Sequence, residues 1–429
     1  MIDHKLIIKN IEEVCKKLIL RNFYLDKKKI LLQDQKRKIL QIEVEKLQNK
    51  RNLQSKIISK IKINNKNIDI YKNKSNKINI LLNEKKQKLK KIKKEIDNYL
   101  STIPNILDEK VPIGKDQKNN IEVKKWGSPK IYNFKIKSHV EIGEKIKYLD
   151  FSRSAKISGS RFVVMKNKIS YMHRALSQFM LNLHTNQHGY EEYYVPYLVN
   201  KNMLYGTGQL PKFYNDFFYA KSFFEDIQSC YALIPTAEVP LTNLMRNEII
   251  DENYLPIKMT SHTPCFRSEA GSYGKDTKGL IRMHQFDKVE IVQIVSPENS
   301  IKALEEITHH AERVLQLLDL PYRKILLCSG DTGFSSCKTY DLEVWMPSRN
   351  KYIEVSSCSN TSDFQSRRTK IRYRKISNKE IHLTHILNGS ALAISRTLAS
   401  IIENYQTKEG NIKVPKILQP YMDGLKLIK

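Results

Sequence analysis

A predicted β-hairpin in the second half of the chain carries side-chain types that bind nucleotides. Alternating residues over Thr260–Val295 indicate two strands joined by a loop rich in glycine and basic residues. Strand side chains alternate between faces, so Arg267 and Glu269 are expected to share one face of the first strand. Three residues are expected on one face of the second strand: Arg282, Phe286 and Glu290. Guanidinium groups bind phosphates, an aromatic ring stacks on a base and carboxylates accept amine donors, which indicates phosphate chemistry.

These residues also fit an ordinary structural role when each is taken singly. Charged residues that alternate along a strand more often mark its solvent face, and the chain contains no phosphate loop of the Walker type. A functional interpretation therefore depends on matching chemistry elsewhere in the chain.

Further segments place carboxylates, hydroxyls and an arginine in a fixed order along the chain. They are Ile234-Pro235-Thr236-Ala237-Glu238-Val239-Pro240-Leu241, Lys338-Thr339-Tyr340-Asp341-Leu342-Glu343-Val344-Trp345, Glu354-Val355-Ser356-Ser357-Cys358-Ser359-Asn360, and Leu387-Asn388-Gly389-Ser390 with Ser395-Arg396-Thr397-Leu398. Together with Pro264–Gly271 and Gly279–Phe286, these segments resemble the ordered motifs of class II aminoacyl-tRNA synthetases. The residues in these motifs are similar to those of the bacterial-type seryl-tRNA synthetase family.

The resemblance implies a serine–tRNA ligase that uses ATP to activate L-serine and then loads it onto tRNA. It assigns catalysis to Arg267, Glu269 and Arg396. The implied ATP-binding residues are Arg267, Ser268, Glu269, Arg282, Phe286, Glu354, Val355, Ser356, Ser357 and Arg396. The cofactor implied is Mg²⁺, held by Glu354 and Ser357, and no zinc is expected. Hard oxygen donors of this kind are what Mg²⁺ requires.

Glu354 and Ser357 can serve one metal ion only if their strand is irregular. In a regular pleat Ser356, rather than Ser357, shares a face with Glu354. Either the strand bulges there or the ligand assignment shifts by one residue.

The amino acid is implied to bind at a second group of polar residues: Thr236, Ala237, Glu238, Glu290, Asn388 and Ser390. Buried carboxylates and hydroxyls would be left unpaired by alanine or glycine, so such a pocket selects serine without a separate editing domain. Each of these residues could instead have an ordinary structural role. Thr236 and Ser390 could cap helices, and Glu290 could pair with a neighbouring lysine.

The residues that precede this chemistry predict a long helical hairpin. Residues 30–103 contain no glycine or proline, and apolar residues recur with alternating spacings of four and three on both sides of the polar turn Asn64–Asn67. The two stripes can be buried against each other if the chain folds back. Periodicity alone favours a coiled coil used for dimerisation. Exposed lysines favour an arm that grips RNA, and they include Lys56, Lys60, Lys86, Lys90 and Lys93.

The formal net charge of +29 favours a polyanionic partner such as RNA. A genome-wide bias toward lysine, asparagine and isoleucine would give the same charge without any binding role. No apolar run is long enough to span a bilayer, and residues 1–4 show no secretory pattern, so a cytoplasmic protein that does not bind membranes is expected. The six cysteines show no zinc spacing.

The expected fold is α+β, with an antiparallel β-sheet catalytic domain flanked by helices. The expected domains are an N-terminal tRNA-binding domain (1–103, arm about 30–103), a linker (104–130) and a class II catalytic domain (131–429). Tyr171–Asn200 resembles motif one, which implies a homodimer. The implied RNA partner is tRNA(Ser), with tRNA(Sec) as a second substrate in bacteria.

Two other functions fit parts of the sequence. An amino acid ligase that loads a carrier protein would not need the hairpin. A non-catalytic RNA-binding paralogue would have lost Arg267, Glu290 or Arg396, and all three are present.

Overall fold

The computed structural model describes residues 1–63, 69–221, 230–270 and 278–429. It divides into two compact units, Ile2–Pro104 and Asn105–Lys429, and Met1 belongs to the second. The predicted turn at 64–67 and the loop glycines Gly271 and Gly274 lie outside the described residues.

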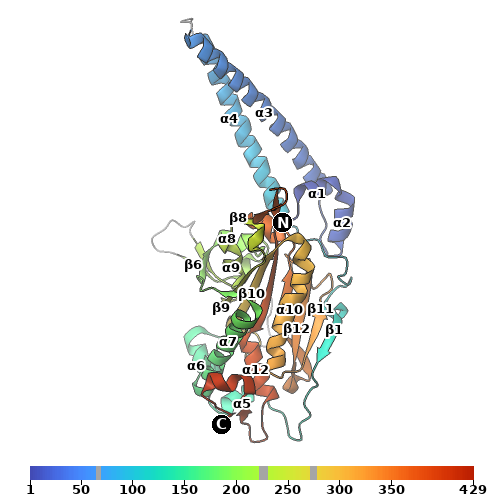
Figure 1. The fold of residues 1–429 in the computed structure, drawn as a ribbon, viewed down its shortest axis with the longest axis vertical. Coiled ribbons are helices and arrows are strands. Elements are labelled where there is room, and N and C mark those ends of the chain that lie inside the picture. Colours follow the sequence, from blue (N-terminus) through green and yellow to red (C-terminus); the bar gives the residue numbers. More distant parts are fainter. Residues whose placement is uncertain (64–68, 222–229, 271–277) are drawn as a thin grey trace. The chain divides into compact units, whose positions relative to one another are not determined.

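The unit Ile2–Pro104 is a helical hairpin with a short helical start. Its helices are α1 (His4–Lys9), α2 (Ile11–Ile19), α3 (Lys27–Ile63) and α4 (Asp69–Leu100), and α3 and α4 run antiparallel along each other (Figure 1). The apolar stripes face inward, because Val44 of α3 and Leu82, Leu89 and Ile92 of α4 are buried while their neighbours are exposed. Lys85 Nζ and Glu43 Oε2, 2.8 Å apart, add an ion pair between the two helices. The predicted helical arm is confirmed.

The second unit is built on an eight-stranded sheet (Figure 1). In spatial order its strands are β1 (Ile121–Trp126), β11 (Tyr322–Leu326), β12 (Lys338–Met346), β13 (Lys351–Asn360), β16 (His385–Ala393), β10 (Gln285–Val295), β9 (Ile257–Phe266) and β4 (Glu191–Glu192). All neighbours are antiparallel except β4 and β9. The predicted α+β class with an antiparallel sheet is confirmed.

Smaller strands form separate sheets beside the large one. They are β5 (Leu198–Asn200), β6 (Tyr219–Lys221) and β7 (Cys230–Leu233); β8 (Ile249–Asp251), β14 (Arg372–Arg374) and β15 (Ile381–Leu383); β2 (Leu149–Asp150) and β3 (Val164–Met165); β17 (Ile412–Lys413) and β18 (Leu427–Ile428).

The two faces of the large sheet have different surroundings, because the side chains of β10 alternate. Val289 and Ile291 point into the main hydrophobic core beneath α7 (Asn167–His188), α10 (Ser300–Leu317) and α12 (Ile394–Asn404). Val292 and Ile294 belong to a second cluster with Leu241 of α9 (Glu238–Leu244). Lys288 and Glu290 share that second face, opposite the main core.

Three local expectations differ from the structure. The predicted linker 104–130 contains β1, which pairs with β11 at the edge of the sheet. The first strand of the hairpin ends at Phe266 rather than Glu269, whose left-handed φ of 51° turns the chain, and β10 begins at Gln285. The prediction that Arg267 and Glu269, and Arg282 with Phe286, share strand faces is therefore wrong, because Arg267, Glu269 and Arg282 lie in the connecting segments.

Among the described residues, the structure contains no helix with both the length and the apolar composition needed to cross a bilayer.

Candidate active site

A cleft on the second face of the sheet collects residues from three separated parts of the chain. Its lining includes Arg267 and Phe286 from the hairpin, Glu354 from β13 and Ser390 and Arg396 from the β16–α12 region. Glu269, Arg282 and Val355 also line it. The adjoining pocket shares Arg267, Glu269 and Arg282 with this cleft and adds Thr236 and Glu238, so the two sets of predicted residues are contiguous.

Arg267 is held at the junction of the two pockets by its backbone and side chain. Its N–H donates to His284 O at 2.9 Å, and its Nε donates to Pro235 O at 3.3 Å. The guanidinium carbon lies 5.2 Å from the ring centre of Phe286, within the range of a cation–π contact. A phosphate can therefore meet Arg267 while a planar base lies near Phe286.

Glu269 and Arg282 form an ion pair across the mouth of the hairpin. The distance from Arg282 NH1 to Glu269 Oε2 is 2.9 Å. Ser268, which directly precedes Glu269, points elsewhere, since its hydroxyl donates to Asn215 O at 2.7 Å. Its side chain lines neither pocket, so only its backbone is left to serve a ligand.

Arg396 joins the first turn of α12 to two other walls of the cleft. Its Nε donates to Ile281 O at 3.0 Å and its NH1 to Glu354 O at 2.8 Å. The side chain of Glu354 is also close, with 3.3 Å between Arg396 NH1 and Glu354 Oε1. Arg396 therefore fixes the spacing between the hairpin and β13.

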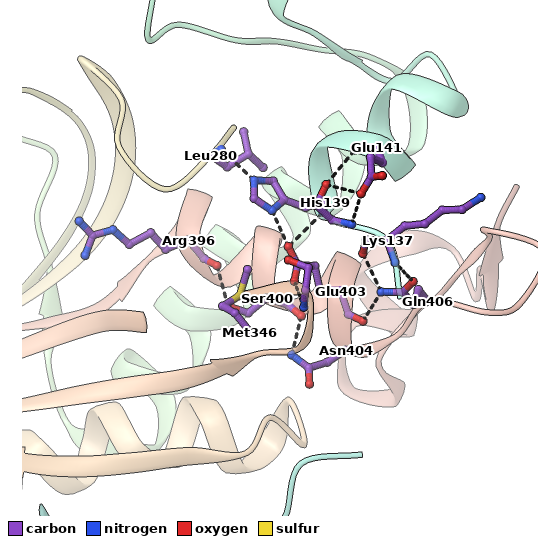
Figure 2. A network of polar contacts seen from close by, with 12 residues as sticks. Lys137, His139, Glu141, Leu280, Met346, Arg396, Ser400, Glu403, Asn404 and Gln406 are labelled. Carbon is purple, nitrogen blue, oxygen red and sulfur yellow. Dashed lines mark hydrogen bonds and ion pairs between the residues drawn. The ribbon is translucent and has the colours of Figure 1, made fainter. Parts of the chain in front are cut away.

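A buried histidine contacts both α12 and the segment before Arg282 (Figure 2). His139, in α5 (His139–Lys145), contacts Glu403 of α12 through Nδ1 at 2.7 Å. Its other nitrogen, Nε2, accepts the backbone N–H of Leu280 at 3.1 Å. The segment that carries Arg282 is thus tied to the helix that carries Arg396.

The bulge that joins Glu354 and Ser357 is present in β13. Leu342 pairs with Ser356 but Glu343 pairs with Glu354, so Val355 is the extra residue. As a result Glu354 and Ser357 face the same side, together with Asp341, which lies opposite Ser357. Ser356 faces away, is buried, and donates its hydroxyl to Ser390 O.

Asp341 adds a carboxylate that the sequence analysis did not select. The pKa of Asp341 is raised well above its ordinary value, mainly by burial and next by the nearby Glu354 carboxylate. A hydrogen bond from the Ser357 hydroxyl opposes this rise. Oδ1 of Asp341 is buried without a hydrogen-bond partner among the described residues. Two carboxylates and a hydroxyl on one face suit a divalent cation that keeps other ligands from a substrate.

The residues predicted to bind the amino acid surround a buried polar cluster. Glu238 accepts a hydrogen bond from Gln365 Nε2 at 2.6 Å and another from Asn388. Burial raises the pKa of Glu238, and the bond from Gln365 and the charge of Lys288 partly oppose this. Ser390 lies opposite Glu290 in the sheet. The side chain of Ala237 packs in the hydrophobic core, so it can offer only backbone groups.

The ordinary roles considered for these residues are met in part. Thr236 accepts the N–H of Glu238 at the start of α9, as a capping residue does, whereas Ser390 lies inside β16 and caps no helix. Glu290 contacts the neighbouring Lys288. The sequence motifs did not indicate Lys288 or Gln365 as site residues. Lys288 could have been found from its position two residues before Glu290, which places both on one face of a strand.

The amino-terminal residues 1–107 match the model of the seryl-tRNA synthetase N-terminal domain, and residues 221–405 match the class II tRNA synthetase core domain (G, H, P, S and T). A crystal structure of seryl-tRNA synthetase from Pyrococcus horikoshii, complexed with ATP, is 36% identical with a TM-score of 0.88, and the match covers 100% of this chain and 99% of that one. The chain belongs to the seryl-tRNA synthetase family.

Other synthetase structures agree with this placement. The cytoplasmic serine–tRNA ligase of Naegleria fowleri, in complex with AMP, is 29% identical with a TM-score of 0.85, covering 100% of this chain and 99% of that one. A Giardia lamblia prolyl-tRNA synthetase with prolyl-adenylate is 17% identical over 65% of this chain and 54% of that one, with a TM-score of 0.57, and supports the fold alone. This synthetase is thus a serine–tRNA ligase with a class II core and a helical arm, as the motifs predicted.

Proposed function

We propose that this synthetase binds ATP and L-serine in the two contiguous pockets, forms seryl-adenylate and transfers the seryl group to tRNA(Ser). The observation that carries the proposal is the convergence of Arg267, Phe286 and Arg396 on a cleft that opens to Thr236 and Glu238. The ATP and AMP in the related structures support a nucleotide in the same fold.

In the first step a carboxylate oxygen of serine attacks the α-phosphorus of ATP and pyrophosphate leaves. Negative charge accumulates on the phosphorus oxygens in the transition state, where fixed guanidinium groups stabilise it more than in the ground state. Arg267 lies between the pockets and is the group proposed to meet the α-phosphate. Arg282 and Arg396 flank the cleft and would bind the rest of the nucleotide.

Phe286 is proposed to stack on adenine, and Glu269 to accept a hydrogen bond from the base while it orients Arg282. Val355 lines the cleft and would contact the nucleotide, whereas Ser268 and Ser356 would contribute through their backbones. Positioning of two substrates supplies the remaining acceleration without a nucleophilic side chain.

The donor set on β13 fits Mg²⁺. Glu354 and Ser357 face one side beside Asp341, whose buried Oδ1 has no hydrogen-bond partner in the described part of the chain. Mg²⁺ is commonly held by one or two carboxylates together with substrate phosphates. Bound there, it would neutralise phosphate charge.

In the second step the terminal adenosine of tRNA attacks the carbonyl carbon of seryl-adenylate, and AMP leaves. We propose that the helical arm holds the tRNA through its phosphate backbone and shape, because lysines such as Lys86, Lys90 and Lys93 are exposed on α4. The same chemistry would extend to tRNA(Sec) where the host makes it. We propose a cytoplasmic homodimer with a tRNA-binding domain at 1–103 and a catalytic domain that begins before residue 131, because β1 belongs to its sheet.

The hairpin also weighs against a ligase for a carrier protein, since a lysine-rich arm has no role in that reaction.

The test is amino-acid-dependent exchange of pyrophosphate into ATP across a panel of amino acids. Exchange is expected with serine, and Arg267→Ala is expected to lower it about 100- to 1000-fold, the usual effect of removing one transition-state donor. Arg372→Ala, on the separate strand β14, is the matched control and should leave exchange unchanged. Undiminished exchange in Arg267→Ala would defeat the proposed mechanism.

A further inference from the structure

Lys288 is a buried cation that lines the cleft next to residues proposed to bind serine. Its side chain is only 6% exposed, and it stands two residues before Glu290 on β10, so both point to the same face. Lys288 Nζ is in ion-pair contact with Glu290 Oε2 and donates a hydrogen bond to Thr236 Oγ1 at 2.8 Å. A single ammonium group therefore links two of the residues proposed to bind serine.

The contacts of Thr236 determine whether its hydroxyl donates or accepts a hydrogen bond toward a ligand. Its oxygen accepts from Lys288 Nζ and also from the backbone N–H of Glu238 at 3.1 Å. A hydroxyl oxygen has two acceptor sites and one proton. Because both acceptor sites are used, Thr236 can act toward a ligand only as a donor.

Glu290 keeps acceptor capacity beside Lys288. Its Oε2 contacts Lys288 Nζ and has no further hydrogen-bond partner among the described residues. An ionised carboxylate accepts at several sites, so the ammonium or hydroxyl group of an amino acid can still donate to it.

The charge state of Glu290 depends on few neighbours. Its pKa is raised to about 7, and burial is the largest cause. Lys288 and Arg267 oppose this rise, whereas Glu238 of α9 adds to it. The thiols of Cys265 and Cys358 are the other titratable groups near it, and burial raises the pKa of both. Lys288 is the nearest cation, so it does most to keep the carboxylate ionised beside a second buried carboxylate.

We propose that Lys288 is the positioning residue of the amino-acid pocket, which holds Glu290 as a charged acceptor and Thr236 as a donor before substrate arrives. This role rests on the proposed serine activation. It requires no contact between Lys288 and the reacting atoms. Its consequence is that loss of Lys288 weakens serine binding through Glu290 while ATP binding is preserved.

The test compares the full-length protein with Lys288→Met in serine-dependent pyrophosphate exchange between pH 6 and 9. In the wild type, kcat/KM for serine should rise with pH as Glu290 loses its proton near pH 7. In Lys288→Met the KM for serine at pH 7.5 should rise at least tenfold, with the KM for ATP within about twofold. The acidic limb of the pH profile of kcat/KM for serine should move to higher pH by about one unit, which corresponds to a tenfold change in proton affinity.

Lys324→Met is the matched control, because Lys324 is a buried lysine of the same sheet that pairs with Glu305 at 2.8 Å. It should leave both KM values and the limb unchanged. A limb in Lys288→Met that coincides with the wild-type limb, or equal rises in both KM values, overturns the proposal. If Lys288→Met does not fold, Lys288→Arg decides, since it keeps the charge and must keep the wild-type limb. Absence of serine-dependent exchange in the wild type would instead reject the proposed function.

Discussion

His139 Nδ1 lies 2.7 Å from Glu403 Oε1, and both side chains are almost completely buried (Figure 2). The geometry requires the proton on Nδ1, because Nε2 accepts the N–H of Leu280. Glu403 Oε2 also accepts the N–H of Ser348 at 3.0 Å. These bonds outweigh the effect of burial, and the pKa of Glu403 is lowered.

Replacement of His139 by alanine should therefore destabilise the catalytic unit. The change leaves Glu403 buried without its main partner, which costs about 3–5 kcal/mol of unfolding free energy. Urea unfolding at pH 7.5 measures the loss. His382→Ala removes a comparable but exposed contact with Glu380, 3.4 Å away, and should change stability by less than about 0.5 kcal/mol. Similar losses in the two variants would contradict a special role for the buried pair.

Phe286 should contribute to ATP affinity rather than to serine affinity. Removal of an aromatic ring that stacks on a base costs about 1–3 kcal/mol, so Phe286→Ala should raise the KM for ATP roughly 5- to 150-fold. Phe286→Tyr keeps the ring and should stay near the wild type. Exchange kinetics with ATP varied at saturating serine provide the measurement, and an unchanged KM in the alanine variant would place adenine elsewhere.

Glu354 should set the requirement for Mg²⁺. Its carboxylate faces the same side as Ser357 because of the bulge at Val355. Glu354→Gln removes one charged ligand, so half-maximal exchange should need at least about tenfold more Mg²⁺, in line with the cost of disturbing metal-site ligands. Exchange measured over a Mg²⁺ titration tests this, with Glu343→Gln as the neighbouring control. Equal titration curves for wild type and Glu354→Gln would exclude Glu354 as a ligand.

The arm lysines should affect tRNA charging without affecting adenylate formation. Lys86, Lys90 and Lys93 are exposed on α4, and replacing all three by alanine should leave serine-dependent exchange intact. The slope of log affinity for tRNA against log salt should fall by about two to three if each lysine meets one phosphate. Filter binding over a salt series measures this. A parallel fall in exchange would indicate that the arm has a structural role instead.

The sequence already determined the helical arm and the chemistry of the cleft. Heptad spacing predicts which residues of α3 and α4 are buried, because a helical repeat needs only local geometry. The ordered motifs predict that Arg267, Phe286, Glu354 and Arg396 belong to one site, and the structure lines one cleft with them. The alternation of a strand left two possibilities beside Glu354, a bulge or a ligand shifted by one residue, and the structure contains a bulge at Val355.

Only the tertiary structure decided which polar groups meet. The hairpin strands end at Phe266 and Gln285, where these two residues form the last pair, and β1 joins the sheet because β11 offers it an edge. Lys288 joins Thr236 across 52 positions of sequence, His139 reaches Glu403 across 264, and Asp341 lies opposite Ser357. Such contacts arise from the packing of whole elements, and no spacing along the chain encodes their distances. The physical reason is that a side chain's charge and hydrogen bonds are set by its neighbours in space, which a linear pattern does not contain.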